Sequence, residues 1–438
     1  MAGLISEASA SAVRFTQILR AKGHQAYLVG GCVRDLLLGL TPKDFDIATS
    51  ARPDELLALF PGADLVGAHF GVVLVAGVEI ATFRSDHDYA DGRHPGQVTF
   101  ETSPAADAAR RDFTINGLFL DPETNRVLDF VEGERDLRNG RIRAIGRPAD
   151  RFAEDHLRLL RAVRFAARFG FAIDAGTMAA MREHAASITR IAAERTRDEL
   201  NRILTEGGAR RGFELLDESG LLLHTLPEIA AMQGVAQPPE FHPEGDVWTH
   251  TLLMLEAMQQ PTLTLAWGVL LHDVGKPPTF KIAERIRFDG HAEVGARMAE
   301  TILLRLRQSN DDIARIVDLV ARHLDWMNLH RMREAKIRRF LRREHFDEHL
   351  ELHRLDCSSS HRRLENYRLA QQRLAELREE DLRPVPLLSG RDLIGAGLKP
   401  GPQFKQILEA VEDAQLEGEL ATRDEALAFA LRLRPDPA

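Results

Sequence analysis

The sequence has few of the features that mark secreted or membrane proteins. It holds only two cysteines in 438 residues, Cys32 and Cys357, and these cannot build a disulfide framework, so we expect a reducing compartment. Its apolar runs, such as residues 71–78, are far too short to span a bilayer. The first residues lack the basic-then-apolar pattern of a secretion signal. We therefore expect a cytoplasmic protein with no membrane partner.

Positive charge is not in excess, and lysine is scarce. Only seven of the 57 basic residues are lysines, and 66 acidic residues outnumber them, which leaves a net charge of −9. This balance excludes a uniformly basic nucleic-acid-binding surface, although it allows a local basic stretch. Arginine suits the planar recognition of phosphates and base edges, but genome composition can produce the same preference.

Length and local patterns predict an α+β fold in which a small mixed sheet with helices is followed by all-α domains. The chain is too long for one ordinary core. Residues rich in valine and isoleucine predict strands at 26–29, 72–75 and 78–83, with short helices at 33–38 and 53–59. Helical periodicity follows at 150–169, 176–186, 194–205 and 209–218, and again from 247 to about 377. The change to helical periodicity near residue 149, with a linker rich in proline near 236–246 and a second proline-containing break at 383–386, suggests four domains, at 1–145, 146–235, 240–365 and 366–438.

A glycine pair near the N-terminus has the features of a phosphate-binding turn. A predicted strand runs into Gly30 and Gly31, and a helix that contains Arg34 follows. Glycines allow backbone N–H groups to approach a phosphate, and the start of a helix adds a positive dipole end. Taken alone, such a pair is more often a plain turn.

Two aspartates follow shortly after this turn. Asp44 and Asp46 flank Phe45, and on an expected strand both carboxylates face one side while Phe45 faces the core. Two such carboxylates can hold Mg²⁺ against substrate phosphates. An isolated pair of this kind is usually a solvated turn, but its combination with the glycine turn and Arg34 indicates a catalytic site.

These motifs together resemble the opening motif of the class II, bacterial-type tRNA nucleotidyltransferases and poly(A) polymerases. The resemblance implies a nucleotidyltransferase head at 1–145 and a helical, nucleotide-selecting neck with an RNA-binding body at 146–235. It implies that Asp44 and Asp46 are catalytic Mg²⁺ ligands, and that CTP, ATP and the 3′ end of tRNA are the substrates. The nucleotide-binding residues would include Gly30, Gly31 and Arg34.

Three further segments of the head are similar to this family. Residues 110–116 resemble its ribose-reading motif, which implies that Arg111 and Asp112 contact the incoming nucleotide; a carboxylate that accepts from a 2′-hydroxyl favours ribose. The polar segment 84–97 resembles the flexible loop used in switching from CTP to ATP, and residues 129–137 resemble a hinge. Glu79 is a weaker candidate for a third acidic residue near the metal.

A basic stretch then offers a means of choosing bases. On one continuous helix, Arg158, Arg161, Arg164 and Arg168 fall on one stripe, with Asp155 close to Arg158. A carboxylate beside a guanidinium matches the amino group and ring nitrogen of both cytosine and adenine, whereas uracil and guanine reverse that pattern. The family resemblance gives the base-reading role to Asp155 and Arg158. It also implies that Arg161 and Arg164 bind the nucleotide, and that residues 194–199 brace this helix.

A second candidate site lies in the helical region beyond residue 246. The ordered set His250, His272, Asp273 and Asp356 resembles the metal ligands of HD-type phosphohydrolases over roughly 247–365, with His291 and His323 where some members place extra ligands. Imidazoles and carboxylates bind divalent transition metals, and a bound metal can activate water against a phosphomonoester or a 2′,3′-cyclic phosphate. The same domain could instead serve only to grip RNA, and the basic segment 330–345 is either a solvated face or an RNA contact.

The sequence leaves several functions open. Within the same chemistry, the enzyme adds C, C and then A to tRNA, adds A alone, or is a poly(A) polymerase. Residues 67–71 lack the paired basic residues associated with the polymerase branch, which favours the tRNA enzyme. Two functions of a different class are also open, an HD phosphohydrolase with a nucleotide-sensing head and a non-catalytic RNA-binding module. The paired aspartates argue against the first of these, and the two candidate metal sites argue against the second.

Overall fold

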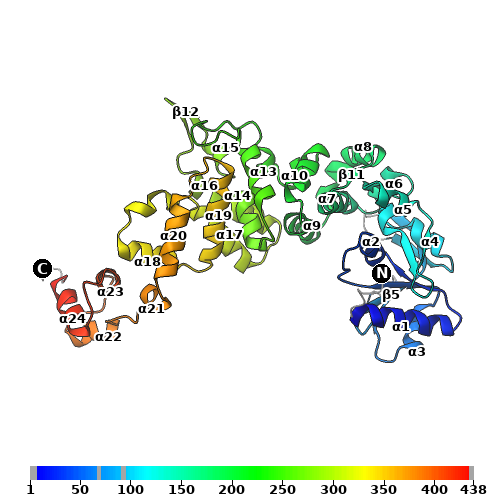
Figure 1. The fold of residues 1–438 in the computed structure, drawn as a ribbon, viewed down its shortest axis with the longest axis horizontal. Helices are drawn as coiled ribbons and strands as arrows, with labels where there is room; N and C mark the ends of the chain where they lie inside the picture. Colours follow the sequence, from blue (N-terminus) through cyan, green and yellow to red (C-terminus); the bar gives the residue numbers. More distant parts are fainter. Residues whose placement is uncertain (1–6, 67–70, 90–94, 434–438) are drawn as a thin grey trace. The chain divides into compact units, whose positions relative to one another are not determined.

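The structure is a computed structural model that describes residues 7–66, 71–89 and 95–433. The chain packs into two compact units. The first comprises the chain up to Ala231 with Gln260–Leu263 and Ile302–Ser309, and the second comprises Met232–Gln259, Thr264–Thr301 and the chain from Asn310 onward. Figure 1 follows the path of the chain by colour. The division into four domains remains a proposal.

The first unit is built on a mixed sheet of seven strands in the order β3-β4-β5-β2-β1-β8-β9. The strands are β1 (Ala26–Val29), β2 (Asp46–Thr49), β3 (Asp64–Leu65), β4 (Val72–Val75), β5 (Val78–Thr82), β8 (Leu118–Asp121) and β9 (Arg126–Asp129). Side chains of β4 and β5 alternate between a buried and a more open face. Strands β1, β4 and β5 are the three that the segments rich in valine and isoleucine predicted. The predicted α+β fold is confirmed.

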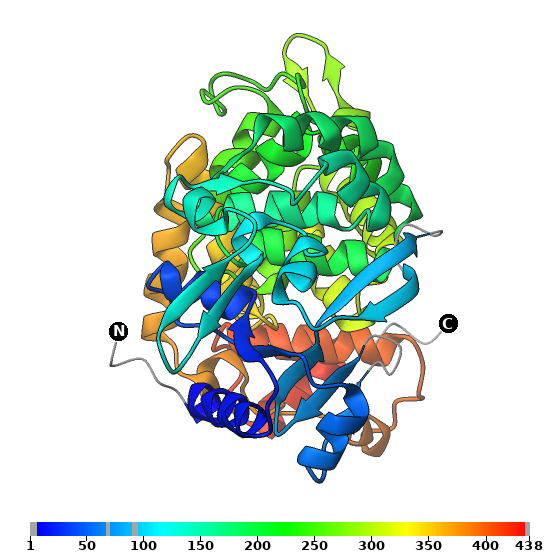
Figure 2. The same cartoon turned by 90° about the vertical axis from the view of Figure 1, so that its right-hand side faces the viewer.

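Helices cover this sheet and continue beyond it. The helices α1 (Glu7–Ala21) and α3 (Pro53–Leu59) pack on the sheet, and Figure 2 shows them beside its strands. The other helices of the unit are α2 (Gly31–Leu37), α4 (Pro104–Ala109), α5 (Gly133–Arg138), α6 (Pro148–Glu154), α7 (Arg158–Phe169), α8 (Ala175–His184), α9 (Ala193–Thr205), α10 (Ala209–Glu218), α11 (Leu221–Thr225) and α12 (Pro227–Ala230). The short strands β10 (Arg141–Ile142) and β11 (Ala172–Ile173) pair in parallel.

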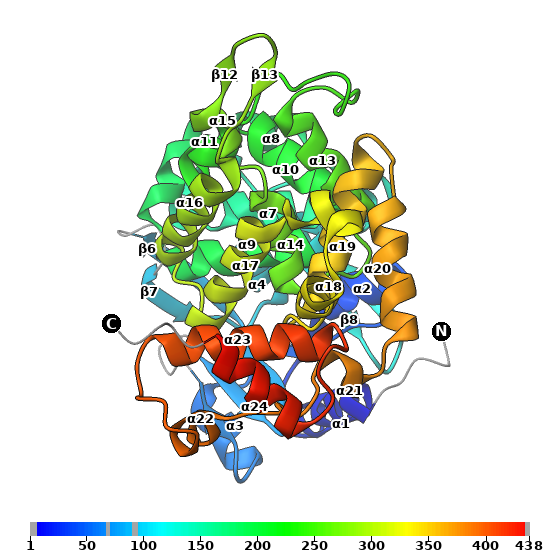
Figure 3. The same cartoon turned by 90° about the vertical axis from the view of Figure 1, so that its left-hand side faces the viewer.

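The second unit is almost entirely helical. It contains α13 (Val247–Ala257), α14 (Leu263–Leu271), α15 (Lys276–Thr279), α16 (His291–Arg305), α17 (Asn310–Arg322), α18 (Glu334–Leu341), α19 (Phe346–Ser359), α20 (Glu365–Glu376) and α21 (Glu379–Leu382), with a small hairpin of β12 (Lys281–Ile282) and β13 (Ile286–Arg287). The helices α22 (Gly390–Gly395), α23 (Gln403–Leu416) and α24 (Arg423–Arg432) pack together around their own apolar core (Figure 3). Among the described residues, no helix has the length and apolarity needed to cross a membrane.

Two local predictions in the head are wrong. Strand β2 begins at Asp46, so Asp44 lies in the preceding loop and not on the strand; Phe45 is nevertheless 5% exposed and packs in the core, as predicted. The segment predicted as a loop at 84–97 forms much of a hairpin of β6 (Arg84–Tyr89) and β7 (Pro95–Phe100), because its two polar arms pair in register. Of residues 67–71, only Gly71 lies within the described part of the chain.

The helix predicted at 150–169 is also interrupted. It breaks between α6 and α7 because Asp155 takes an extended backbone conformation and its Oδ1 accepts a hydrogen bond from the Leu157 N–H at 3.1 Å. Aspartate side chains compete with the helical backbone in this way. In the basic segment 330–345, only α18 is α-helical, because Met332 and Arg333 are extended and His345 is left-handed.

Candidate functional sites

Sheet register places the end of the glycine turn beside Asp46. Val29, the last residue of β1, is the antiparallel partner of Asp46, so the turn at Gly30 starts next to this carboxylate. Strand β2 also runs parallel to β5 with Ile47 opposite Ile80, which puts Glu79 beside Asp46 on the same face. The structure therefore brings the weaker candidate Glu79 close to Asp46, the aspartate predicted to be catalytic.

Asp46 is largely buried and lies close to two other acidic side chains. Burial, together with the negative charge of Glu79 and, to a smaller degree, of Asp44, raises the pKa of Asp46 to about 6, against the opposing positive charge of Arg111. Carboxylates crowded in this way become easier to ionise when a divalent cation binds among them. Asp44 is exposed, so its contribution to a metal site depends on the loop ahead of β2.

The turn itself accepts only glycine at its first position. Gly30 has φ of 72°, and a Cβ atom there would lie 3.0 Å from Nη1 of Arg111. Arg34, on the helix that follows, is 4% exposed; its Nη1 donates to Asn116 Oδ1 at 2.7 Å, and its Nη2 lies 2.6 Å from Asp35 Oδ1. These contacts hold the Arg34 guanidinium in place behind the turn.

A cavity of about 510 Å³ joins these residues to the helical neck. Its lining includes Gly30, Gly31, Arg34, Asp46, Arg111, Asp112, Asp155, Arg158, Arg161 and Arg164, which are all of the predicted head and neck site residues except Asp44. Asn116, Arg195 and Arg202 also line it, although no sequence pattern assigned them a binding role. Within this one cavity there is room for a ligand that contacts both the turn and α7.

The arginine stripe of α7 forms ion pairs and is not a solvated face. Arg161 donates through Nε and Nη2 to Asp112 Oδ2 at 2.8 and 2.6 Å. Despite its burial, Asp112 keeps a pKa far below the usual range because of Arg161 and the hydrogen bond from Asn116. Arg164 donates to the buried Glu199 at 2.6 Å. These contacts pack α7 against both the head and α9.

The proposed base-reading residues have other partners in this structure. Asp155 pairs with Arg195 at 3.1 Å, and Arg158 Nη1 donates to Glu154 at 2.7 Å. The helix break at Asp155 removes the spacing that would have placed Asp155 next to Arg158 on one helix. Both side chains still line the same cavity, so they can face one ligand from separate segments.

The second unit contains three histidines held in a common way. His272, His291 and His323 each donate Nδ1–H to the carbonyl oxygen three residues earlier, at 2.7 to 2.8 Å. In a neutral ring, Nε2 then carries a lone pair. Burial favours the neutral ring, since it lowers the pKa of His291 and lowers that of His323 to about 4. The Nδ1 contacts of all three rings leave Nε2 as the atom that could bind a metal ion.

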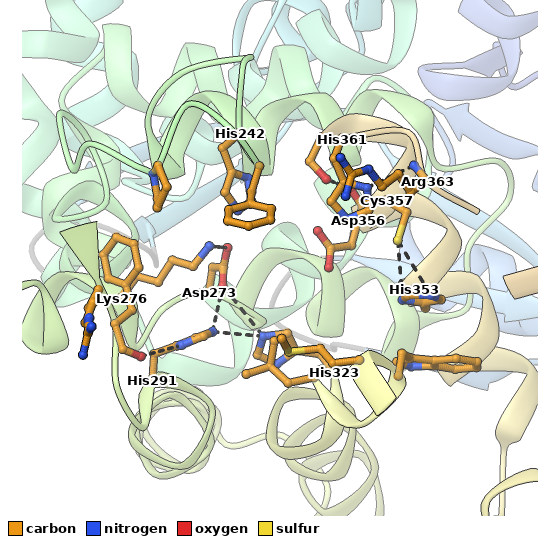
Figure 4. A pocket seen from close by; sticks show the side chains of 18 of the residues that line it. His242, Asp273, Lys276, His291, His323, His353, Asp356, Cys357, His361 and Arg363 are labelled. Atoms are coloured by element: carbon orange, nitrogen blue, oxygen red, sulfur yellow. Dashed lines mark hydrogen bonds and ion pairs between the residues drawn. The ribbon is translucent and has the colours of Figure 1, made fainter. Parts of the chain in front are cut away.

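The Nε2 atoms of the three histidines all lie close to the Asp273 carboxylate. His291 Nε2 and His323 Nε2 are 3.2 Å apart, and they lie 3.5 and 3.8 Å from Asp273 Oδ1. His272 Nε2 is 3.1 Å from Asp273 Oδ2. Figure 4 shows Asp273, His291 and His323 pointing toward one another. Two lone pairs and a carboxylate at these distances repel one another unless a cation lies between them, so the residues fit a metal ion.

The remaining two predicted ligands complete this cluster. His250 is fully buried, and its Nε2 lies 3.2 Å from Asp356 Oδ1. On its other side, Nδ1 lies 2.7 Å from Glu244 Oε1, which also accepts from His242. The structure thus brings together all six predicted residues, and Asp273 is shared by two groups of possible ligands. His242 and Glu244 were missed because they lie in the linker, where nothing in the sequence marks them as ligands.

A cavity of about 1020 Å³ opens onto this cluster. Asp273, His291, His323 and Asp356 line it (Figure 4). Lys276, which the sequence did not single out, lies at its wall with Nζ 2.7 Å from Asp273 Oδ2. The cavity is large enough for a phosphate ester with its attached group.

Three family models match the chain. The Poly A polymerase head domain matches residues 26–143, the probable RNA and SrmB-binding site of polymerase A matches 170–233, and the HD domain matches 246–358. The first segment contains the head residues that line the 510 Å³ cavity, and the second lies in the helical region that follows. The third contains His250, His272, Asp273, His291, His323 and Asp356, which we call the histidine cluster.

Individual relatives match to different extents. A CCA-adding enzyme of Levilactobacillus brevis is 46% identical over 209 residues, which is 47% of this chain and 52% of that protein. An A-adding tRNA nucleotidyltransferase of Deinococcus radiodurans is 37% identical over 93% of this chain and 95% of that protein. The structure of the Bacillus stearothermophilus CCA-adding enzyme in complex with CTP superposes with a TM-score of 0.73 and 27% identity, and the match covers 98% of both chains.

Proposed function

The chain belongs to the tRNA nucleotidyltransferase family, and from this premise we propose that it adds C, C and then A to the 3′ end of tRNA. CTP and ATP would be the substrates, no nucleic-acid template would be needed, and pyrophosphate would be released. The observation that carries the proposal is the cavity that joins Gly30, Asp46 and Asp112 of the head to Asp155 and Arg158 of the neck. The two buried, unpaired cysteines agree with action in the cytoplasm.

The residues divide the chemistry between them. Asp44 and Asp46 would hold Mg²⁺, which lowers the pKa of the tRNA 3′-hydroxyl and offsets charge on the phosphates when it is bound. The N–H groups of the Gly30–Gly31 turn and the Arg34 guanidinium would bind the triphosphate and stabilise the leaving pyrophosphate. Asp112 would accept from the ribose 2′-hydroxyl, while Arg161 keeps its carboxylate ionised.

Base choice would rest on Asp155 and Arg158. A carboxylate accepts from the exocyclic amino group of cytosine or adenine, and a guanidinium donates to the neighbouring ring nitrogen. Uracil and guanine would leave both groups facing a like partner in a buried site, which is costly. To read a base, Asp155 has to exchange its contact with Arg195, whereas Arg158 can keep its contact with Glu154 and use its remaining N–H groups.

One assay tests this function. Transcripts of tRNA that end before CCA, after C and after CC are each incubated with one nucleoside triphosphate at a time. We expect CTP to extend the first two transcripts and ATP to extend the third by one residue. Long adenylate tails would indicate a poly(A) polymerase and contradict the proposal.

Addition of A alone is the second candidate. It is favoured by the relative from Deinococcus radiodurans, which is named an A-adding tRNA nucleotidyltransferase and matches nearly the whole chain. In the same assay, this candidate predicts that only the transcript ending in CC is extended, and only with ATP.

We further propose that the histidine cluster is a metal-dependent phosphohydrolase. The convergence of the Nε2 atoms on Asp273 supports a divalent transition metal there, and the adjoining cavity supports a phosphomonoester or 2′,3′-cyclic phosphate as substrate.

The variant His272→Ala tests this second site. Removing one ligand is expected to reduce Mn²⁺-stimulated hydrolysis of nucleoside 2′,3′-cyclic phosphates at least about 100-fold, because the metal loses one of its nitrogen ligands. The variant should still add nucleotides to tRNA at the wild-type rate. His224→Ala, which removes an exposed histidine of α11, is the control and should hydrolyse normally. Absence of hydrolysis in the wild type, with Mn²⁺, Ni²⁺ or Co²⁺, would contradict the phosphohydrolase assignment.

A further inference from the structure

A buried carboxylate beside the head cavity has no role in the chemistry described above. Asp107 lies on α4 and is completely buried. Its Oδ1 accepts from Arg110 Nε at 2.8 Å and lies 2.7 Å from Arg110 Nη2. Its Oδ2 accepts from Arg111 Nε at 3.2 Å and from Arg111 Nη2 at 2.9 Å. The guanidinium of Arg110 therefore contacts one oxygen of the carboxylate, and the guanidinium of Arg111 contacts the other.

Asp107 remains ionised in this setting. Burial alone would favour the neutral acid, but Arg111 and Arg110 hold the pKa of Asp107 below its usual range. A buried anion is stable only when paired and hydrogen-bonded, so the carboxylate and the two guanidiniums fix one another's positions.

Arg111 points from this carboxylate into the nucleotide cavity. Its Nη1 is the atom that a Cβ on Gly30 would approach to 3.0 Å, so it lies against the glycine turn. It lines the cavity together with Asp46. The guanidinium therefore lies against the glycine turn, in the cavity that Asp46 also lines.

Arg110, the second partner, connects the same carboxylate to the neck. Its backbone oxygen accepts from Arg158 Nη2 at 3.1 Å, and its Nη1 lies 3.5 Å from Asp86 of β6. Asp107 thus holds a segment that contacts both the glycine turn and the proposed base-reading arginine.

We propose that Asp107 is a positioning residue for nucleotide binding: it orients Arg111 toward the triphosphate of the incoming nucleotide. This inference rests on the proposed nucleotidyltransferase function. Without the carboxylate, Arg111 keeps its charge but loses its fixed direction, so the bound nucleotide is held less well. The loss should appear mainly in KM, because Arg111 acts on the triphosphate before and during the reaction.

Asp107→Asn is the primary test, with addition of A to a tRNA transcript ending in CC as the assay. Asparagine offers one oxygen, and its NH₂ group opposes the other guanidinium. We expect the KM for ATP to rise about tenfold, with a smaller change in kcat, since charge-assisted contacts are lost. Asp121→Asn, which removes a carboxylate bonded to Arg20 at 2.8 Å on β8, should leave KM unchanged.

A second variant keeps the test decisive if Asp107→Asn fails to fold. Arg111→Lys retains the charge at a side chain that is 17% exposed, but lysine cannot place two N–H groups on Oδ2. Its KM for ATP should rise about tenfold, because the paired contact with Asp107 that fixes its direction is lost. Where Asp107→Asn folds, the double variant should show no further rise.

The two proposals fail in different ways. If the wild-type chain adds no nucleotide, the proposed function is wrong. If the wild type is active but Asp107→Asn lowers only the melting temperature, or Arg111→Lys has the wild-type KM, then Asp107 is structural and the inference is overturned.

Discussion

Replacing Asp46 with alanine is expected to abolish nucleotide addition, with a fall in kcat of roughly 1000-fold or more, because the charge on the reacting phosphate is no longer offset. Asp46 is the partner of Val29 at the start of the glycine turn, and its carboxylate lines the nucleotide cavity. The measurement is the rate of addition of one A to a transcript ending in CC, at saturating ATP and Mg²⁺.

The fold should survive this substitution. Asp46 is crowded by Glu79 and Asp44, so its removal relieves repulsion and should leave the melting temperature equal to or above that of the wild type. Asp64→Ala, at an exposed position of β3, serves as the control for loss of an acidic residue and should be fully active. Transfer of AMP at an appreciable rate by Asp46→Ala would refute the role of Asp46 as a metal ligand.

Replacing Arg158 with alanine is expected to relax the choice of base. Three N–H contacts, to Arg151 O, Glu154 and Arg110 O, hold the Arg158 guanidinium at the cavity wall, and two of its five N–H groups remain for a base. Without these two N–H groups, the free-energy penalty for binding uracil or guanine in place of cytosine or adenine becomes smaller. We expect the preference for the correct nucleotide over UTP or GTP to drop by about 10- to 100-fold, as for loss of one base-edge contact.

Single-nucleotide incubations with the three transcripts measure this preference directly. Arg147→Ala removes an exposed arginine ahead of α6 and controls for the loss of positive charge. If Arg158→Ala slows the addition of C and A equally and admits neither U nor G, Arg158 has a structural role and does not read the base.

The head site could be predicted because its signals are local. Strand β1 is apolar on successive residues, and Gly30 follows it where a positive φ is required, so the turn and the helix after it are readable from the chain. The placement of Asp46 beside the turn then follows from pairing of neighbouring strands. The proximity of Asp46 to Glu79 also follows from pairing, but it needs the parallel partner, which local patterns do not specify.

What the sequence did not predict correctly depends on particular side-chain contacts, which the local periodicity of the sequence does not reveal. Asp155 lies in a strongly helical pattern, yet its side chain bonds the Leu157 N–H and ends the helix. No prediction was made for Asp107, because an aspartate among alanines on a short helix is typical of a surface residue, and its burial depends on Arg110 and Arg111 folding back onto it. In the histidine cluster, the order of residues that resembles HD-type phosphohydrolases predicted which side chains come together, whereas Glu244 became visible only through its distance to His250.

The central claim is that Asp44 and Asp46 together hold the divalent ion that serves nucleotide transfer. It is tested most directly by a crystal of the protein soaked with CTP and Mn²⁺, with data collected for anomalous scattering from manganese. The account predicts a manganese peak coordinated by both carboxylates and by oxygens of the triphosphate. A triphosphate bound in the head cavity with no manganese at Asp44 and Asp46 would contradict it.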